Sequence, residues 1–468
     1  MIKPIGFQLW ECNIASSHLV SEKHMKIHLI AIGGAVMHNL AIALHTSGHE
    51  VTGSDDEIFE PSFSRLSSHG LLPEKMGWHP ERLHEGLDTV IIGMHARADN
   101  PELLQAQQMG LPVLSFPEFV FSQSAFATRV AICGSHGKTT ITSMIMHALK
   151  LERKAFDYLV GAQLEGFDTM VQFSEAPIMV IEGDEYFASP LDRRPKFLHY
   201  RPQIALISGI AWDHFNVFPT YENYTDQFRL LAEQMDGEGV LLASADDTEL
   251  THLLRTWKTA VRVEPYSALP YRIHDGSVII EWEGADFLVG VFGRHNLTNM
   301  SGAMQVCREL GIQPVNFLQH MATFRGAAKR LELLSSSPDK KIYRDFAHAP
   351  SKVAATVQAV AEMHPESPFT AALELHTFSS LNKDFLPQYR GSMHGASTKI
   401  VFFTPHTLAM KKLPAISAEE ILDFFDDPEI MVFTDTEELF TYLRTTSPSL
   451  LLLMSSGNFG NLNIDGLM

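Results

Sequence analysis

Lys138 and Thr139 close a short glycine turn, GSHGKTT, which follows an apolar run and precedes a helical pattern. The backbone N–H groups of such a turn and the dipole of the helix would point at one spot, which suits a phosphate. Lys138 could neutralise the outer phosphates of a nucleotide while the Thr139 hydroxyl ligates magnesium. Only two residues separate Gly134 from Gly137, fewer than in the common phosphate-loop pattern, so a plain turn between strand and helix stays open.

Three acidic residues after the apolar run APIMVI could complete a magnesium site. Glu182, Asp184 and Glu185 would offer the oxygen ligands that this ion prefers. Clustered carboxylates are costly unless a cation lies among them, although a solvated acidic turn would give the same pattern. His214, after the next apolar run, is a further candidate ligand, but a single histidine is more often a hydrogen-bonded structural residue.

The N-terminal part has the layout of a second nucleotide site. Gly33 and Gly34 follow a buried-strand pattern, and Ser54 and Asp55 come roughly 20 residues later, where a Rossmann turn places an acid. The third glycine of the dinucleotide pattern is missing. The stretch therefore predicts either a nucleotide diphosphate site or simply tight packing of a strand against a helix.

Further polar clusters lie where domains should meet: FGRHNLTNMSGA at 292–303, FRGAAKRLELL at 324–334 and RDFAHAPSKV at 344–353. In them, Arg330 could reach a phosphate and Asp345 could accept hydrogen bonds from ribose hydroxyls. Each cluster alone would equally fit a surface loop with capping residues.

Strand and helix patterns alternate in three blocks, which predicts an α/β protein built on parallel sheets. Several strands end in polar residues, and ligands gather at the carboxyl ends of strands in open α/β sheets. We expect a tail at 1–24, a first domain at 25–128, a central domain at 129–333 and a third domain at 334–468.

Composition narrows the possible partners. A chain of 468 residues predicts two or three domains, and its formal charge of −19 argues against a nucleic-acid or membrane-surface binder. Cys12, Cys133 and Cys307 are too few and too scattered for a disulfide framework or a thiolate zinc site, so a reducing cytoplasm is expected. The sequence contains no apolar run long enough to cross a bilayer and no clear signal peptide.

Taken together, the motifs resemble those of the Mur ligases, the ATP-dependent amide-forming enzymes of peptidoglycan synthesis. The resemblance covers nearly all of the chain from Met25 onward. It rests on the order and spacing of GSHGKTT (134–140), IEGDEY (181–186), WDH (212–214), GRHN (293–296), the F-x-G-x-x-x-R run at 324–330 and DFAHAP (345–350). The short glycine spacing is the family's own version of the phosphate loop, so the resemblance implies that a nucleotide binds there.

The resemblance also implies a fold: a Rossmann-like UDP-binding domain, a central ATP-binding domain with a mostly parallel sheet, and a C-terminal Rossmann-like domain that binds the incoming amine. It implies ATP and Mg²⁺ as cofactors. The implied catalytic residues are Lys138, Glu182, His214 and Arg330, and the implied metal ligands are Thr139, Glu182 and His214. The implied ATP site comprises Gly134, His136, Gly137, Lys138, Thr139, Thr140, His295, Asn296, Arg330 and Asp345. The implied substrate site comprises Gly33, Gly34, Ser54, Asp55, His348 and His376.

The reaction implied by the resemblance joins the lactyl carboxylate of UDP-N-acetylmuramate to an amine through an acyl phosphate. The runs VTGSDDEIFEP and ELHTFSSLNKD (374–384) are similar to the branch that attaches the tripeptide L-alanyl-γ-D-glutamyl-meso-diaminopimelate, which serves peptidoglycan recycling. The alternative is L-alanine as the amine. Gly209 and Ala211 stand where the family usually has an Asn and an acid, which also leaves open a nucleotide-binding and UDP-sugar-binding protein without catalysis.

Overall fold

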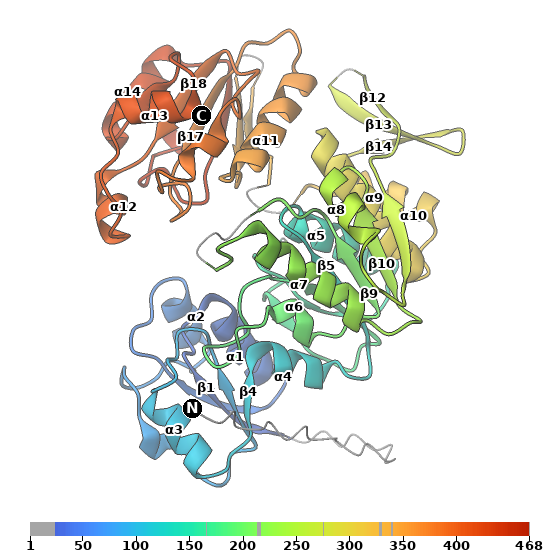
Figure 1. Cartoon of the computed structure of the whole chain (residues 1–468), viewed down its shortest axis with the longest axis vertical. Coiled ribbons are helices and arrows are strands. Elements are labelled where there is room, and N and C mark those ends of the chain that lie inside the picture. The colour runs from blue at the N-terminus through green and yellow to red at the C-terminus, as the bar shows by residue number, and fades with distance from the viewer. Residues whose placement is uncertain are drawn as a thin grey trace.

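The computed structural model of the protein describes residues 24–164, 166–212, 217–274, 276–326, 330–337 and 340–467. This part of the chain forms three α/β domains that follow one another along the molecule, with a small antiparallel sheet attached to the middle one (Figure 1). The predicted fold class, α/β with three domains and mostly parallel sheets, is confirmed. His214, a predicted metal ligand, lies outside the described residues.

The first domain is a parallel sheet in the order β2-β1-β3-β4 with helices on both faces. The apolar side chains of α1 pack on one face and those of α3 on the other. Its elements are β1 (Lys26–Ile30), α1 (Ala35–Thr46), β2 (Glu50–Ser54), α2 (Ser62–Ser68), β3 (Thr89–Ile92), α3 (Pro101–Gln108), β4 (Val113–Ser115) and α4 (Phe116–Gln123), with a short 3-10 turn at Pro80–Arg82.

The central domain has a seven-stranded sheet in the order β11-β10-β9-β5-β8-β6-β7, parallel except for β7. Its strands are β5 (Thr128–Cys133), β6 (Asp157–Leu159), β7 (Val171–Gln172), β8 (Ile178–Glu182), β9 (Ile204–Ile207), β10 (Val240–Ser244) and β11 (Arg262–Tyr266). Its helices are α5 (Lys138–Leu151), α6 (Lys196–His199), α7 (Tyr221–Gln234), α8 (Thr248–Leu254), α9 (Arg294–Glu309) and α10 (Pro314–Met321).

The order of these strands reverses beside β5. From β5 the chain continues to β6 on one side, whereas β9, β10 and β11 lie on the other side. Such a switch point opens a crevice at the carboxyl ends of the strands, where α/β proteins bind ligands. The glycine turn that follows β5 therefore occupies the most favourable position in this sheet for a nucleotide.

A small antiparallel sheet of β12 (Tyr271–His274), β13 (Ser277–Trp282) and β14 (Ala285–Val289) projects from the central domain (Figure 1). This sheet is not among the elements predicted from the sequence. In β13 buried residues alternate with partly buried ones, and Gly284 at φ +79° stands in the turn before β14; both features are typical of a β-hairpin.

The third domain is a six-stranded sheet in the order β15-β16-β20-β17-β18-β19, in which only β15 is antiparallel. Its strands are β15 (Glu332–Ser336), β16 (Lys341–Asp345), β17 (Thr370–Glu374), β18 (Thr398–Phe402), β19 (Met431–Phe433) and β20 (Leu450–Met454). Its helices are α11 (Pro350–Met363), α12 (Pro405–Met410), α13 (Ala418–Phe425) and α14 (Thr436–Thr446), with 3-10 turns at Leu386–Tyr389 and Asp465–Leu467.

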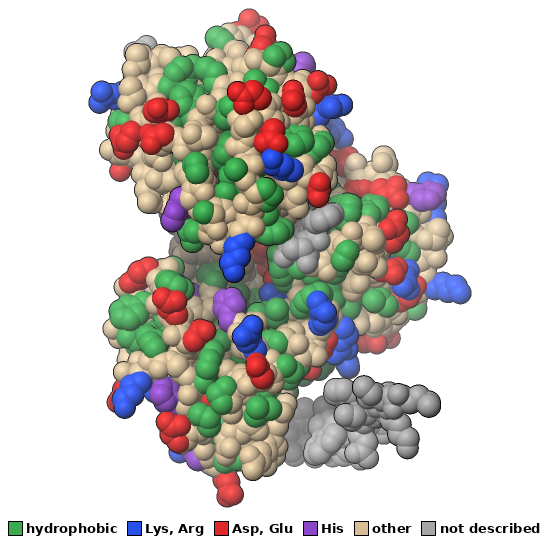
Figure 2. Space-filling model, turned by 60° about the vertical axis from the view of Figure 1, so that its left-hand side comes forward, with side chains coloured by type: hydrophobic (Ala, Val, Ile, Leu, Met, Phe, Trp, Pro, Cys, Tyr) green, Lys and Arg blue, Asp and Glu red, His purple; other side chains and the backbone are tan. Residues whose placement is uncertain are grey.

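The two domain junctions differ in kind. The first and central domains share one continuous apolar cluster, which joins the side chains of β1 and α1 to those of α6 and α7. The central and third domains meet through fewer contacts, including a hydrogen bond from Tyr271 Oη to Glu362 Oε1 (2.6 Å) and the rings of Phe292 and Tyr343, whose centroids are 5.5 Å apart. Figure 2 shows a hollow between the third domain and the rest of the molecule.

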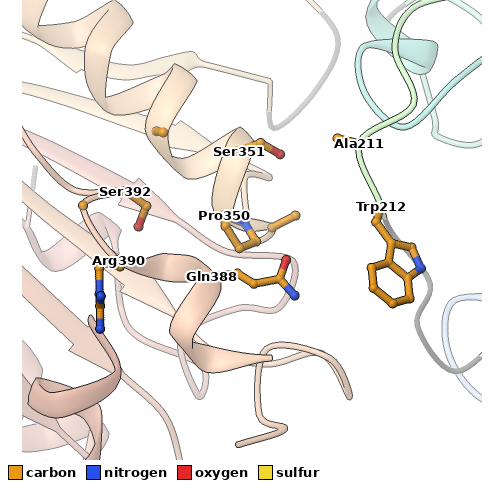
Figure 3. Close-up of a pocket in the computed structure, with 10 residues that line it drawn as sticks. Ala211, Trp212, Pro350, Ser351, Gln388, Arg390 and Ser392 are labelled. Carbon is orange, nitrogen blue, oxygen red and sulfur yellow. The ribbon is translucent and has the colours of Figure 1, made fainter. Parts of the chain in front are cut away.

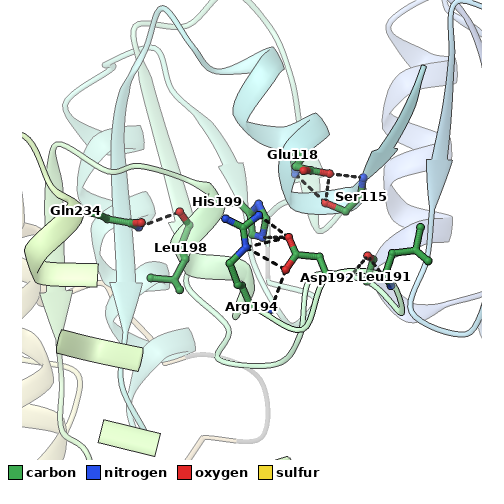
Figure 4. Close-up of polar contacts among 9 residues, drawn as sticks. Ser115, Glu118, Leu191, Asp192, Arg194, Leu198, His199 and Gln234 are labelled. Atoms are coloured by element: carbon green, nitrogen blue, oxygen red, sulfur yellow. Dashed lines mark hydrogen bonds and ion pairs between the residues drawn. The ribbon is translucent and has the colours of Figure 1, made fainter. Parts of the chain in front are cut away.

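A polar cluster also lies at the first junction (Figure 4). Glu118 of α4, Asp192 and His199 bring potential metal ligands within 4.8 Å of one another, and His199 Nε2 is 3.2 Å from Asp192 Oδ2. The Arg194 guanidinium donates hydrogen bonds to both carboxylate oxygens of Asp192, at 2.6–3.1 Å. An arginine thus supplies the positive charge that these acids need, and the cluster acts as a polar contact between domains.

No helix in the described ranges is both long enough and apolar enough to span a bilayer.

Candidate active site

The turn between β5 and α5 has the shape that a bound phosphate needs. Gly134 (φ +116°) and Gly137 (φ +74°) adopt left-handed backbone conformations, which glycine takes without strain. Gly137 caps α5 without a side chain, and the first turn of the helix contains no acidic residue. The first N–H groups of α5 and the positive end of its dipole can therefore face an anion.

Replacing Gly137 by alanine should disable this turn. A Cβ there would overlap the Asn299 side chain of α9, and the positive φ would strain any residue that carries a side chain. We expect Gly137→Ala to raise the KM for ATP by ~10-fold or more in initial-rate assays, because strain of about 1–3 kcal/mol falls on the phosphate-binding backbone. Gly110→Ala is the control, since Gly110 has a similar φ of +68° but no atom within 4 Å of the place that its new methyl group would take. Equal KM values for the two variants would contradict the assignment.

Lys138 supplies the positive charge of the turn. Its Nζ donates to the Gly134 carbonyl at 2.7 Å and pairs with Glu185 Oε2 at 2.6 Å. Burial alone would lower the pKa of Lys138, but the charges of Glu185 and Asp184 outweigh burial and raise its pKa above the ordinary value. The side chain is therefore an ammonium at neutral pH, held at the mouth of the turn.

Glu182 links the turn to the neighbouring strands. Its Oε1 accepts a hydrogen bond from Thr139 Oγ1 at 2.9 Å, and its Oε2 accepts one from the Gly161 amide at 2.8 Å. A hydroxyl and a half-buried carboxylate side by side at the start of a phosphate-binding helix are the hard oxygen donors that Mg²⁺ prefers. Thr139 and Glu182 thus fit the predicted metal site, while the third predicted ligand, His214, is not described.

The acidic cluster after β8 is not a solvated turn. Glu185 is fully buried against Lys138, and Asp184 pairs with Lys196 Nζ at 2.6 Å. Each carboxylate therefore has a separate partner, which relieves the repulsion among them. The sequence left these acids open between magnesium ligands and a solvated turn, whereas in the structure Glu185 positions the lysine of the phosphate turn.

The phosphate turn also touches the third domain. His136 Nε2 lies 2.7 Å from the Ser351 hydroxyl, in the first turn of α11. Arg330, at the junction between the two domains, lies over the Phe346 ring, with its guanidinium carbon 4.4 Å from the ring centroid. Burial lowers the pKa of Arg330, while the negative charges of Asp345 and Glu182 act in the opposite direction. Arg330 is therefore close enough to the candidate metal site to interact electrostatically with the Glu182 carboxylate.

Asp345 has a more internal position than predicted. Its Oδ2 accepts a hydrogen bond from the Leu331 amide at 2.5 Å, and its Oδ1 accepts hydrogen bonds from the Ala347 amide at 2.7 Å and from Thr356 Oγ1 at 3.3 Å. The residue is buried, and its carboxylate ties the start of the third domain to the loop after β16. These contacts give Asp345 a role in shaping the junction; a contact with a nucleotide stays a prediction.

His295 and Asn296 begin α9, beside the phosphate turn. Burial lowers the pKa of His295 to about 4, so its imidazole is neutral at pH 7. The Asn296 side chain donates to the Phe292 carbonyl at 3.1 Å, at the start of its own helix. The residue of α9 that lies directly against Gly137 is Asn299, one turn further along the helix.

The N-terminal candidates come together as the Rossmann layout predicts. The Gly33 amide donates to Asp55 Oδ2 at 2.7 Å, and Gly34 caps α1 without a side-chain hydrogen bond. Ser54 is buried and its hydroxyl accepts a hydrogen bond from Arg82 at 3.1 Å. The carboxyl ends of β1 and β2 thus form a small polar site around Asp55.

Polar side chains connect this site to the central domain. Arg65 of α2 donates to Asn39 Oδ1 at 3.0 Å, to Gln163 Oε1 at 3.2 Å and to the Asp168 carbonyl at 3.4 Å. Gln163 is two residues beyond Gly161, whose amide contacts Glu182. A ligand lying along this line would therefore extend from the first domain toward the phosphate turn.

The two predicted histidines of the third domain lie at different strand ends. His348 follows β16, and its Nδ1 is 2.8 Å from the Phe346 carbonyl. His376 follows β17, and its Nδ1 is 3.7 Å from Glu374 Oε1. His348 is close in sequence to Ser351, which contacts the phosphate turn, whereas His376 lies against the loop after β20 at Gly457. Their roles in substrate binding stay predictions.

Several residues near the site were missed by sequence analysis. Asn299 and Ser351 contact the phosphate turn from α9 and α11. Asp247, after β10, accepts a hydrogen bond from the Ile210 amide at 2.7 Å and brings an acid next to Gly209, where the local sequence lacks one. The sequence could have indicated Asp247, because this acid follows an apolar strand of the same sheet. Nothing in the sequence singles out Ser351.

Comparison with known proteins assigns most of the chain. Residues 26–125 match the model of the Mur ligase family catalytic domain, and residues 132–307 match that of the Mur ligase middle domain. The UDP-N-acetylmuramate–L-alanine ligase of Rubrobacter xylanophilus is 30% identical over 90% of this chain and 94% of its own length. The UDP-N-acetylmuramate–L-alanyl-γ-D-glutamyl-meso-2,6-diaminoheptandioate ligase of Escherichia coli is 28% identical over 72% of this chain and 75% of its own.

Solved structures agree on the fold. A murein peptide ligase from Psychrobacter arcticus superposes with a TM-score of 0.64 at 22% identity, covering 95% of this chain and 98% of that one. A UDP-N-acetylmuramate–alanine ligase from Thermotoga maritima superposes with a TM-score of 0.68 at 18% identity and the same coverage. At these identities the superpositions establish the three-domain architecture alone.

Proposed function

The chain belongs to the Mur ligase family, and from this premise we propose that it joins the lactyl carboxylate of UDP-N-acetylmuramate to the amine of L-alanine or of a short peptide. Members of the family are ATP-dependent ligases that form carbon–nitrogen bonds. The observation that carries the proposal is the arrangement of Lys138, Thr139 and Glu182 around a turn shaped for phosphate, at the switch point of the central sheet.

L-Alanine is the first candidate for the amine. Of the two relatives described above, the L-alanine ligase matches the chain almost from end to end, and the tripeptide ligase matches a smaller share. This order reverses the one that sequence motifs suggested, in which the tripeptide came first. The tripeptide remains the second candidate for two reasons. The stretch at 374–384 has no arginine. The cleft between the central and third domains (Figure 3) has a volume of about 370 Å³, which lies within the ~300–1,000 Å³ of ordinary ligand sites.

In the proposed mechanism, an oxygen of the lactyl carboxylate attacks the γ-phosphorus of ATP and displaces ADP, which turns a poor electrophile into an acyl phosphate. Lys138 and Arg330 stabilise the charge on the transferring phosphoryl group. Thr139 and Glu182 would hold Mg²⁺, which when bound supplies further neutralisation of phosphate charge. The amine then attacks the acyl carbon to form a tetrahedral intermediate. As this intermediate collapses to the amide, inorganic phosphate leaves and the nitrogen releases a proton.

The sugar nucleotide would bind to the first domain, near Gly33, Gly34 and Asp55. From there its lactyl group would extend past Arg65 and Gln163 toward Glu182. This path supports the proposal, since it joins a nucleotide-like site in one domain to the phosphate turn of the next. Closure of the third domain over the hollow would exclude the water that otherwise hydrolyses an acyl phosphate.

The decisive experiment measures ADP release with Mg²⁺, ATP and UDP-N-acetylmuramate, with L-alanine or L-alanyl-γ-D-glutamyl-meso-diaminopimelate as the amine, and identifies the product by mass spectrometry. Faster turnover with L-alanine supports the biosynthetic ligase. Faster turnover with the tripeptide supports the recycling ligase. Binding of ATP and UDP-sugar without turnover of either amine would replace the proposal by a non-catalytic binding protein.

Binding of UDP-N-acetylmuramate should weaken as the pH falls through about 6. Burial raises the pKa of Asp55 to about 6, against hydrogen bonds from the Gly33 and Asp56 amides that lower it. The carboxylate, which accepts hydrogen bonds from sugar hydroxyls, is therefore lost below that pH. The same raised pKa means that ionised Asp55 destabilises the fold, so its contribution to stability falls as the pH rises from about 4 to 6.

Calorimetric Kd values between pH 5 and 8 test this expectation. Asp55→Asn should bind more weakly than the wild type at pH 8 and show a flatter pH profile. Identical profiles for the two proteins would remove Asp55 from the binding site.

A further inference from the structure

The polar cluster at the first domain junction lies where helix α4 of the first domain meets helix α6 of the central domain (Figure 4). Glu118 belongs to α4, Asp192 to the loop before α6, and His199 is the last residue of α6. Each side chain offers one potential ligand atom, and the three atoms lie within 4.8 Å of one another. Two carboxylates and one imidazole from two domains therefore converge on one point.

The imidazole of His199 has a buried nitrogen that no hydrogen bond satisfies. The side chain is 6% exposed, and its Nε2 lacks a hydrogen-bond partner among the described residues. Nε2 lies 3.2 Å from Asp192 Oδ2, but this contact does not have the geometry of a hydrogen bond. A buried polar atom without a partner is destabilising. An ion shared with the carboxylates would therefore stabilise Nε2 as well.

The spacing of these atoms suits a metal ion. Two ligands of a tetrahedral zinc ion are ~3.3 Å apart, because each lies ~2.0–2.1 Å from the metal. The 3.2 Å between His199 Nε2 and Asp192 Oδ2 is close to that value. Glu118 Oε2 accepts hydrogen bonds from the amide and the hydroxyl of Ser115, at 2.8 and 2.7 Å. These bonds hold the carboxylate in place, and its Oε1 can bind the ion.

The position of the histidine is fixed as well. Gln234 Nε2 of α7 donates a hydrogen bond to the Leu198 carbonyl at 2.9 Å, which ties the short helix α6 to its neighbour (Figure 4). Ligands that the surrounding structure already holds lose little freedom when an ion binds, which favours a tight and selective site.

Arg194 balances the charge of Asp192 but does not satisfy the histidine. Its guanidinium donates to both carboxylate oxygens of Asp192 at 2.6–3.1 Å. The Arg194 side chain is 64% exposed, and ion pairs at that exposure are weak. A divalent ion has twice the charge of a guanidinium and can contact both carboxylates and the imidazole at once. Such an ion could therefore displace the Arg194 guanidinium into solvent.

We propose that Glu118, Asp192 and His199 bind a divalent transition-metal ion, best matched by Zn²⁺, which ties the first domain to the central domain. One imidazole together with carboxylates suits Zn²⁺, whereas Mg²⁺ prefers oxygen ligands and keeps most of its water. The site shares no residue with the candidate magnesium site at Thr139 and Glu182. The inference thus goes beyond the proposed function and assigns the ion a structural role.

The test is calorimetric titration of the full chain with Zn²⁺. The protein is first dialysed against a chelator and then against chelator-free buffer with excess Mg²⁺, which occupies sites built from oxygen ligands alone. The wild type should bind one Zn²⁺ per chain. His199→Gln and Asp192→Asn should each weaken this binding by about 100-fold or more, since even the loss of a group behind a metal ligand typically costs ~10- to 100-fold. His252→Gln, which removes an exposed histidine of α8, is the matched control and should bind like the wild type.

Arg194→Gln should change the affinity in the opposite direction. Removal of the competing guanidinium should tighten Zn²⁺ binding by ~2- to 5-fold, as expected for the loss of a weak exposed ion pair. A folding defect would weaken binding, so this variant separates the proposed site from a general loss of structure. Zn²⁺ should also raise the Tm of the wild type and of Arg194→Gln and leave that of His199→Gln nearly unchanged, because an ion stabilises only the state that binds it.

Three results would overturn the inference. The first is no Zn²⁺ binding to the wild type in excess Mg²⁺, which would leave the cluster as a polar contact alone. The second is equal Zn²⁺ affinity in the wild type and in His199→Gln, which would place the ion elsewhere. The third is weaker or unchanged binding in Arg194→Gln. The titration uses neither substrate nor turnover, so its outcome is independent of the proposed ligase reaction.

Discussion

Lys138→Ala should lower kcat for ADP release by roughly 10³-fold or more while UDP-N-acetylmuramate still binds with nearly the wild-type Kd. Lys138 Nζ lies at the mouth of the phosphate turn, and its charge stabilises the phosphoryl group most strongly in the transition state. Asp55 and the other sugar-nucleotide candidates belong to the first domain, whose contacts the substitution does not touch. The substitution should therefore lower kcat for ADP release and leave the Kd for UDP-N-acetylmuramate nearly unchanged.

A second variant is needed to separate loss of stability from loss of catalysis, because Lys138 also neutralises Glu185. That carboxylate is fully buried, and removal of its partner costs about 3–5 kcal/mol of stability. The double variant Lys138→Ala with Glu185→Gln should regain much of the lost stability and remain inactive. Lys154→Ala, just beyond the end of α5, serves as the control for loss of a lysine. Turnover by the double variant at a rate near that of Lys154→Ala would refute the assignment of the phosphate turn.

Glu182→Gln should lower kcat by about 10²- to 10³-fold and raise the Mg²⁺ concentration needed for half-maximal activity. The amide has the shape of the carboxylate and can still accept the Gly161 N–H, so the fold should be preserved. It lacks the negative charge that attracts the metal, and its NH₂ group would face the Thr139 hydroxyl. The loss should therefore appear in metal dependence and rate rather than in thermal stability.

The measurement is ADP release at increasing Mg²⁺ for Glu182→Gln and for Glu175→Gln, an exposed acid before β8. Glu175→Gln should follow the wild-type curve. If the half-saturating Mg²⁺ concentration is the same in both variants, Glu182 does not bind the metal, and its role is confined to holding Gly161 and Thr139.

The sequence predicted the parts of the site that depend on local chain geometry. A turn of small residues between a buried strand and a helix has few conformations, so GSHGKTT already indicated a glycine turn that leads into a helix, which the structure places at α5. The left-handed conformations of Gly134 and Gly137 are seen only in the structure. The contact between Gly33 and Asp55 was predictable in the same way, because adjacent parallel strands bring their carboxyl ends together.

The partners of these residues depend on packing between distant segments, and a single sequence contains little information about it. The sequence left Asp184 and Glu185 open between candidate metal ligands and a solvated acidic turn, whereas in the structure Glu185 faces Lys138 and Asp184 faces Lys196. Both acids lie in the loop after β8, where no regular alternation sets the direction of the side chains, and the surrounding elements decide which cation each one meets. Ser351 reaches His136 for a similar reason: their contact requires the third domain to dock at one particular angle.

The unequal junctions have a consequence for how the protein loses its structure. One apolar cluster extends from β1 to α8 through the first and central domains, whereas the main apolar clusters of the third domain are formed almost entirely by its own residues. Elements that share a core melt cooperatively, and those joined by fewer contacts can melt separately. Scanning calorimetry of the ligand-free protein should therefore resolve two unfolding transitions. ATP together with the amine should bring the two transition temperatures closer, because the ligands would contact both sides of the hollow.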